Sequence, residues 1–193
     1  LAISAQLITD NSNFLKDPIQ FLNIRGNELT IEFRETAKKD SFLKEVSNFV
    51  QSIPPLRTMA SGTVLIADEL FSNALFDAPT DKNGRRKFND LPRNSKIELD
   101  PGDHATLFLS YDDDKLLIAA RDPFGSMDEC RFLNRLQSCY SGEQITDVNM
   151  GVGGAGIGCR MLFDHSISLY VGVKKGSCTV TCCVLALGPS EKM

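Results

Sequence analysis

The stretch that decides the fold is "TMASGTVLIADELFSNALFD", Thr58 to Asp77. It is apolar nearly all round from Val64 to Phe76, a pattern that predicts a helix buried on most sides. Glu69 and Asn73 are the exceptions, and their spacing of four residues puts both side chains on one helix face. A carboxylate is costly to bury, so a buried glutamate usually signals a paired charge, a metal or a catalytic role. The stretch therefore predicts a core helix that carries a functional polar pair.

Two interpretations of this pair stay open at the level of the residues. The amide oxygen of Asn73 is a ligand that hard cations accept, so the pair predicts a Mg²⁺ and water site. The structural alternative is that Glu69 reaches the sheet edge or pairs with an arginine.

The flanking sequence predicts strands that meet through hairpins, with helices grouped between them. Alternation in Leu29–Arg34 predicts a strand, and apolar residues three and four apart predict a helix over Lys38–Ile53. Residues 78–103, with the "GRRK" cluster, have the composition of a long loop, and residues 1–22 are weakly patterned. The other predicted elements are a hairpin of Thr106–Tyr111 and Lys115–Ala120, helices over Asp128–Leu136 and Ile157–Phe163, and a hairpin of Ser166–Val173 and Cys178–Ala186.

This order predicts an α+β protein, a two-layer α/β sandwich. Its sheet is expected to be mixed but mostly antiparallel, with helices covering one face. We expect residues 1–28 to form an N-terminal extension or linker and residues 29–193 to form one domain.

Composition excludes several classes of protein. A formal charge of −4, with only one short basic cluster, argues against duplex nucleic acid as a partner. No apolar run approaches the roughly 20 residues of a membrane span, so we expect no membrane association. The six cysteines form no C-x-x-C pair, which predicts reduced and mostly packed thiols. No signal-peptide pattern is present, so we expect a cytoplasmic location.

Two further stretches could carry chemistry. Asp122 opens "DPFG" directly after a strand, which alone indicates a β-turn, but a carboxylate there can also accept a hydrogen bond from an exocyclic amine such as that of adenine. The glycines of "GVGGAGIG" (151–158) lead into a helix N-terminus, whose free backbone N–H groups favour an anion. Taken alone, this glycine stretch fits a linker and a phosphate cradle equally well.

Together, "DELFSNA" (68–74), "DPFGS" (122–126) and "GGAGIG" (153–158) resemble the N box and the two glycine boxes of the GHKL ATPases. That superfamily includes gyrase B subunits, histidine kinases, MutL proteins and anti-sigma factor serine kinases. The match spans about Leu29 to Leu187 and implies the family's Bergerat α/β sandwich.

The resemblance implies a role for each matching residue. Glu69 would be the catalytic glutamate that orders or activates water, Asn73 would bind Mg²⁺, and Asp122 would bind the adenine amine. Ser177 or Thr179 would support the adenine pocket, and Ser141 to Ala155 would form the ATP lid. The nucleotide-binding residues implied are Asn73, Asp77, Asp122, Phe124, Gly125, Gly151, Gly153, Gly154, Gly156, Ile157, Gly158 and Thr179.

The chain also departs from the family's pattern at both ends of the site. Phe124 and Ser126 stand where the first glycine box has glycines, and the phenylalanine could crowd the base or stack on it. Phe76 and Asp77 stand where the N box often has a basic residue or histidine, and an acid there repels triphosphate unless a metal intervenes.

The sequence thus predicts an ATP-binding regulatory protein that uses ATP and Mg²⁺, and anti-sigma factor serine kinases are the most similar branch. Its expected partner is a signalling protein, namely a sigma factor, an antagonist or a receiver-type protein, and a homodimer stays open. A complete sensor histidine kinase is disfavoured, because neither His104 nor His165 lies on a phosphoacceptor-type helix. The alternatives are a catalytically inactive nucleotide-sensing or protein-binding regulator and an α+β domain without a ligand.

Overall fold

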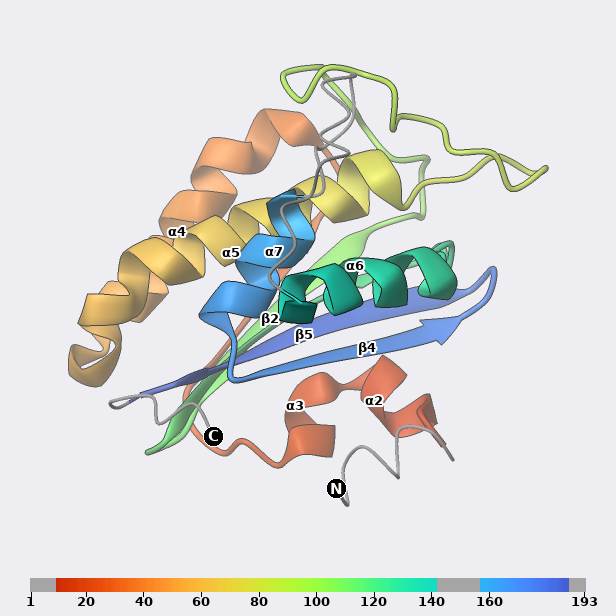
Figure 1. Cartoon of the computed structure of the whole chain (residues 1–193). Coiled ribbons are helices and arrows are strands. Elements are labelled where there is room, and N and C mark those ends of the chain that lie inside the picture. Colours follow the sequence, from red (N-terminus) through yellow and green to blue (C-terminus); the bar gives the residue numbers. More distant parts are fainter. Residues whose placement is uncertain (1–9, 142–156, 188–193) are drawn as a thin grey trace.

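The computed structural model describes residues 10–141 and 157–187, which form an α+β protein around a five-stranded sheet (Figure 1). The strand order is β1-β2-β3-β5-β4, and every neighbouring pair is antiparallel. The expectation of a mixed sheet is therefore wrong for this part of the chain, because each strand runs back along its neighbour. The strands are β1 (Glu28–Phe33), β2 (Ala105–Tyr111), β3 (Lys115–Asp122), β4 (Ser168–Lys174) and β5 (Cys178–Ala186).

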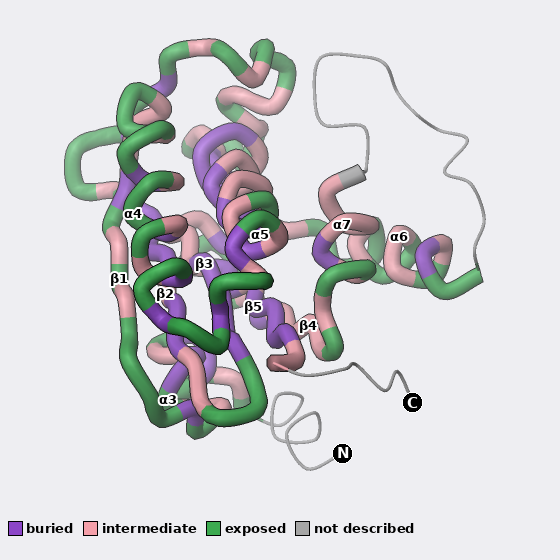
Figure 2. The backbone as a smooth tube through the Cα atoms, turned by 90° about the vertical axis from the view of Figure 1, so that its left-hand side faces the viewer, coloured by how far each residue is buried: buried purple, intermediate pink, exposed green. Residues whose placement is uncertain are grey.

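Helices α4, α5, α6 and α7 cover one face of this sheet (Figures 1 and 2). The core beneath α4 and α5 centres on the rings of Phe33, Phe42 and Phe71, whose centroids lie 4.8 to 4.9 Å apart. The elements on this side are η1 (Thr36–Lys38), α4 (Lys39–Ser52), η2 (Pro54–Met59), α5 (Ala60–Ser72), η3 (Asn73–Asp77), α6 (Glu129–Ser141) and α7 (Ile157–His165). The predicted positions of α4, both hairpins and α7 are confirmed, while α6 continues five residues beyond the predicted end.

The opposite face of the sheet is also covered, by α2 (Ser12–Lys16) and α3 (Pro18–Leu22) (Figure 1). Phe14 and Ile19 of these helices are buried against Leu117 and Val180 of the sheet. The prediction that helices cover one face only is therefore wrong. From Leu116 to Ala120 of β3, alternate residues face the two cores and all five are apolar, so each face must be shielded from water. Residues 12–24 thus belong to the folded core and do not form a linker.

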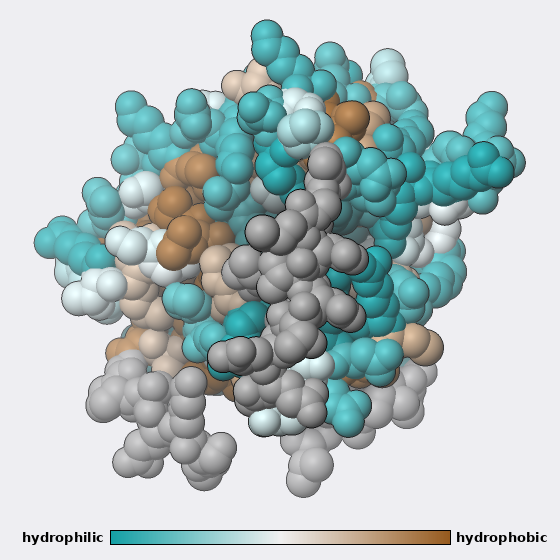
Figure 3. Space-filling view, turned by 45° about the horizontal axis from the view of Figure 1, so that its top comes forward, coloured by the Kyte–Doolittle hydropathy of each residue, from teal (hydrophilic) through white to brown (hydrophobic). Residues whose placement is uncertain are grey.

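The 78–104 loop contains no helix or long strand, as predicted, but it is anchored to the body. Ile97 and Leu99 are buried in the main core, and Thr36 Oγ1 donates to Ser95 O at 3.0 Å. Hydrophilic side chains project where this loop leaves the body of the molecule (Figure 3). The loop is thus held near β2, and also at Arg86, whose guanidinium donates to Ser126 O at 2.7 Å, while other parts of it project into solvent.

All six cysteines lie in the described residues and are free, as predicted, and Cys139, Cys182 and Cys183 are buried. Among residues 10–141 and 157–187, none of the helices has both the length and the apolar composition required to cross a bilayer.

Candidate functional site

The polar pair predicted on the buried helix lies at the end of α5. The Asn73 side chain lies close enough to the Glu69 carboxylate to lower its pKa, and both residues are half-buried. Burial raises the pKa of Glu69, while Asn73 and the nearby charge of Arg93 partly offset that rise. An amide lowers the pKa of a carboxyl group through its NH₂, so the Asn73 carbonyl oxygen remains available to a cation. Both open interpretations of Glu69 thus have support, because it faces an arginine and also carries a potential metal ligand beside it.

The helix does not run unbroken to Asp77 as predicted, because Asn73 to Asp77 form a π-helical turn. Its closing bond runs from Ala78 N to Asn73 O at 2.9 Å, an i to i+5 bond. Such single-turn π segments insert a residue into the helical repeat and occur frequently at functional sites. Here the turn begins at Asn73, the residue that supplies the amide, four positions after Glu69.

Helix α7 brings the second glycine stretch against this pair at Gly158. A Cβ atom on Gly158 would lie 1.6 Å from Glu69 Oε1 and 2.2 Å from Glu69 Cδ, so any other residue here would displace the Glu69 carboxylate. The contact joins two motifs that are separated by almost 90 residues in the sequence. The remaining predicted phosphate-binding glycines, Gly151, Gly153, Gly154 and Gly156, the side chain of Ile157 and nearly all of the predicted lid lie outside the described residues.

Asp122 ends β3 and forms the turn that its sequence predicts. Its Oδ1 accepts hydrogen bonds from Phe124 N at 2.9 Å and from Gly125 N at 3.4 Å. Burial raises the pKa of Asp122 to about 6, although these two bonds and the Thr179 hydroxyl oppose the rise. Both backbone bonds use Oδ1, which leaves Oδ2 for a further donor. The turn and the ligand-binding interpretations are therefore compatible.

Thr179 lies opposite Asp122 in the β3–β5 register and is only 2% exposed. Its hydroxyl is close enough to lower the pKa of Asp122, but the contact falls short of good hydrogen-bond geometry, and Thr179 Oγ1 is buried with no partner in the described part of the chain. A buried hydroxyl without a partner is costly and is commonly satisfied by a ligand or an ordered water. Ser177, the other candidate, is exposed in the β4–β5 turn, so Thr179 is the better match.

Gly125 has a packing role that the sequence did not reveal. Its φ of +58° is left-handed, and a Cβ there would lie 2.0 Å from Lys174 O and 2.8 Å from Ser177 N. Gly176 N also donates to Gly125 O at 3.2 Å. Glycine at this position therefore lets the β4–β5 turn dock against the "DPFGS" segment.

The residues that depart from the first glycine box make structural contacts. Phe124 is half-buried and packs against the main core. Ser126 Oγ donates to Ala78 O at 2.6 Å and accepts from Arg86 Nη1 at 2.7 Å. Arg86 Nη2 donates to Ser126 O at 2.7 Å, and Arg86 Nη1 also donates to Asp77 O. Ser126 and Arg86 thus join "DPFGS" to the end of the π-helical turn.

Sequence reasoning missed Arg93, which the 78–104 loop brings to the same place. Arg93 Nη2 lies 2.8 Å from Asp77 Oδ2, and its guanidinium carbon lies 4.9 Å from the centre of the Phe76 ring. An ion pair between residues 16 apart across an irregular loop has no periodic signal in the sequence. The one indication in the sequence was Asp77 itself, an acid at a position where the GHKL family often has a base, because such an acid calls for a cationic partner.

The residues of the candidate site fit a magnesium ion that is coordinated mainly by the phosphates of a bound molecule and by water. In the described ranges, no group of three His, Cys, Asp or Glu side chains forms a metal cage. Mg²⁺ is often bound through one or two protein oxygens together with substrate phosphates and water. The Asn73 carbonyl oxygen beside Glu69 can supply one protein oxygen of this kind, whereas the described residues offer no complete metal cage.

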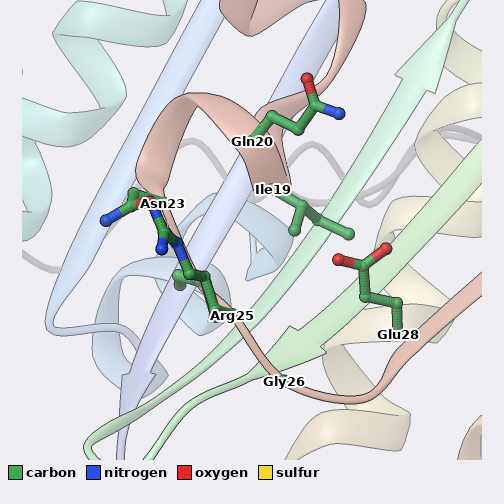
Figure 4. A pocket seen from close by; sticks show the side chains of 7 residues that line it. Ile19, Gln20, Asn23, Arg25, Gly26 and Glu28 are labelled. Atoms are coloured by element: carbon green, nitrogen blue, oxygen red, sulfur yellow. The ribbon is translucent and has the colours of Figure 1, made fainter.

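A shallow pocket lies elsewhere, on the side covered by α3 (Figure 4). Its lining comes from α3 and the segment leading into β1, and it shares no residue with the three motifs. Arg25 Nε donates to Asn23 Oδ1 at 2.8 Å, a local bond between two exposed side chains of the lining. The pocket therefore adds nothing to the candidate site.

Comparison with protein-family models finds no match to this chain, and comparison with curated proteins finds no significant similarity.

Proposed function

We propose that this chain is an adenine-nucleotide-binding regulatory protein whose site is of the GHKL type, on a Bergerat-like fold. The observation that carries the proposal is the meeting of three motifs that lie far apart in the sequence. Glu69 contacts Gly158, and Ser126 is bonded to Ala78 at the end of the π-helical turn. Packing alone does not require partly buried carboxylates with raised pKa values at two of these three motifs, whereas the GHKL-type site uses a carboxylate at both.

Asp122 and Thr179 would bind the adenine ring. The Asp122 carboxylate keeps Oδ2 free to accept from the exocyclic amine, and the Thr179 hydroxyl is a buried group in need of a partner. A site built to hydrogen-bond an amine discriminates strongly against analogues that lack it. Adenine nucleotides, rather than polyphosphates in general, are therefore the proposed ligands.

Asn73 would hold Mg²⁺ together with the phosphate oxygens, and the ion would supply charge neutralisation there. The N-terminus of α7, which begins at Ile157, favours an anion through its free N–H groups and its dipole. Gly158 brings this helix end against Glu69. The carboxylate would then lie close to the nucleotide's terminal phosphate.

In the active form, we propose a protein kinase that phosphorylates a serine or threonine of a signalling partner. The bond between the γ-phosphorus and the bridging oxygen breaks, a bond to the partner's hydroxyl oxygen forms, and Glu69 takes the hydroxyl proton. The raised pKa of Glu69 suits this role, because a base works best when its pKa lies nearer the working pH. A sigma factor, an antagonist or a receiver-type protein is the proposed partner class, and this rests on the resemblance alone.

A second candidate function is a nucleotide sensor without turnover. Phe124 packs on the core and Ser126 is held by bonds to Ala78 and Arg86, so the first glycine box is rigidly tied. Glycines at those positions would leave the backbone free to move around a ligand. A first glycine box that is fixed in place by such contacts favours nucleotide binding and signalling over repeated catalytic cycles.

Titration calorimetry with ADP and ATP, with and without Mg²⁺, tests the proposal on the unmutated protein. We expect saturable binding that Asp122→Asn reduces by about 10-fold to 100-fold, since a carboxylate bond to the base is replaced by an amide. Asn73→Ala should remove the Mg²⁺ dependence and leave Mg²⁺-free binding unchanged. Arg57→Ala, on an exposed turn away from the motifs, is the matched control.

The outcomes separate the candidates. Absence of saturable binding by the unmutated protein rejects both nucleotide functions and leaves an α+β domain without this ligand. Binding without hydrolysis or transfer favours the sensor. If turnover occurs, Glu69→Ala should abolish it while binding persists, and unchanged turnover would contradict the role given to Glu69.

A further inference from the structure

The guanidinium of Arg93 has more hydrogen-bond donors than the described residues satisfy. An arginine side chain carries five N–H donors, and among those residues Arg93 makes one side-chain bond, from Nη2 to Asp77 Oδ2 at 2.8 Å. Its Nη1 is buried and has no partner in residues 10–141 and 157–187, although about a third of the side chain remains exposed. A buried charged donor without a partner is costly, so its retention calls for a partner that is present in function.

The position of this guanidinium is well defined on both sides. Its guanidinium carbon lies over the buried Phe76 ring, 4.9 Å from the ring centre, while Asp77 pairs with Nη2. Along the chain, Arg86 anchors the loop to Ser126 before Arg93, and Ser95 accepts from Thr36 after it. Because the loop is fixed at both flanks, the guanidinium is preorganised and loses little entropy on binding.

The charges nearby make a cation necessary if a polyphosphate binds. Glu69 and Asp77 lie around the end of α5, and the charges of Asp77 and Asp68 raise the pKa of Glu69. Asp68 is paired with Lys39, whose Nζ lies 2.5 Å from Asp68 Oδ1, whereas Arg93 is the cation that lowers the pKa of Glu69. Without Arg93, the carboxylates of Glu69 and Asp77 would repel an incoming triphosphate.

We propose that Arg93 binds the terminal phosphates of the nucleotide, supplying from the 78–104 loop the positive charge that Asp77 does not provide. The inference rests on the proposed nucleotide-binding function. Guanidinium groups match phosphate oxygens in a planar, bidentate geometry, and Arg93 keeps its Nη1 free for this contact. Asp77, which looked unfavourable for ATP, then becomes the residue that orients the phosphate ligand.

The test compares ATP, ADP and adenosine by calorimetry on the full chain and on Arg93→Ala, Arg93→Lys and Arg85→Ala. Arg85 lies on the same loop and is exposed with no side-chain bond to the described residues, so Arg85→Ala is the matched control. We expect Arg93→Ala to weaken ATP binding about 10-fold to 100-fold and to leave adenosine binding within about twofold, since adenosine has no phosphate. Arg93→Lys, which keeps the charge and its pair with Asp77, should lie between.

Each result has one meaning. Equal weakening of ATP and adenosine, or unchanged ATP binding in Arg93→Ala, overturns the role of Arg93 while the nucleotide site stands. If the unmutated protein binds neither adenosine nor ATP, the proposed function fails, and this inference fails with it. Should Arg93→Ala not fold, as judged by its thermal unfolding, Arg93→Lys decides: ATP binding equal to that of the unmutated protein would overturn the specific contact.

Discussion

At the scale of single residues, the candidate site contains groups that destabilise the folded state. Burial raises the pKa of Asp122 and Glu69, so their ionised forms are disfavoured by the fold. Thr179 adds a buried hydroxyl and Arg93 a buried nitrogen, and neither has a hydrogen-bond partner among the described residues. These costs collect where the three motifs meet. Such clustering is expected of a binding site, where a ligand provides the missing partners.

Asp122→Asn should therefore stabilise the unliganded protein at neutral pH. The pKa of Asp122 is about 6 when folded and 3.8 in the reference state, so the folded protein binds more protons between these values, and stability falls as pH rises through this window. Above pH 6 the penalty is at most about 3 kcal/mol. We expect the variant to gain about 1 to 3 kcal/mol at pH 7.5 and little at pH 4, measured by urea unfolding.

Asparagine can still accept the turn bond from Phe124 N, so the local fold is kept. Asp103→Asn, a partly exposed aspartate in the loop before β2, is the control and should change stability by less than about 0.5 kcal/mol. Equal stability of Asp122→Asn and the unmutated protein across pH 4 to 8 would contradict a buried, proton-binding carboxylate.

At the scale of elements, the site depends on how α7 meets α5. The buried helix predicted from residue 58 to 77 becomes a 3-10 segment, a regular helix and a π-helical turn, and that turn begins at Asn73. Gly158 lets α7 approach so closely that its backbone touches the Glu69 carboxylate. Two helices from distant parts of the chain thus define the position of one carboxylate.

A double-mutant cycle tests this contact without a nucleotide. Gly158→Ala places a methyl group on Glu69 Oε1, the movable end of a flexible side chain, so the fold should persist while the carboxylate shifts. In a Glu69→Ala background the clash is gone, and the better helix propensity of alanine should stabilise α7 by up to about 1 kcal/mol. We expect the two backgrounds to differ by about 1 kcal/mol or more in urea unfolding. The same change in both would show that the contact is absent in solution.

At the scale of the whole molecule, the sheet is the middle of three layers. Alternate residues of β3 and β5 serve two cores, one under α4 and α5 and the other under α2 and α3 (Figures 1 and 2). The short N-terminal helices therefore shield apolar residues of the sheet, including Leu117 and Val180. Without that cover, the second face would expose a continuous apolar surface to water.

Phe14→Ala measures how much this third layer contributes. Phe14 is fully buried, stacks edge-on to Phe21 at 5.5 Å, and lies 2.8 Å from where a Cβ on Gly172 would be. Removing the ring should cost about 3 to 5 kcal/mol of unfolding free energy. Leu133→Ala, at a side chain that is 61% exposed on α6, should cost less than about 0.5 kcal/mol. A loss for Phe14→Ala no larger than that of this control would show that α2 does not close the core.

The sequence by itself determined the local part of this protein. Period-two and helical spacings predicted β1, α4, both hairpins and α7, because such periodicities report which face of an element is apolar. The spacing of Glu69 and Asn73 likewise predicted the polar pair. The continuous apolar run in β3 indicates a strand that is covered on both faces. The weak pattern of residues 1–22, however, did not predict the helices that cover the second face.

Only the tertiary structure decided which distant groups meet. Three contacts join segments that lie between 16 and almost 90 residues apart. They are the hydrogen bond of Arg86 to Ser126, the ion pair of Arg93 with Asp77 and the contact of Gly158 with Glu69. No periodicity encodes them, because they depend on the path of an irregular loop and on the packing of one helix against another. The raised pKa of Asp122 has the same origin, since burial by the assembled fold, and not the residue's neighbours in sequence, disfavours its charge.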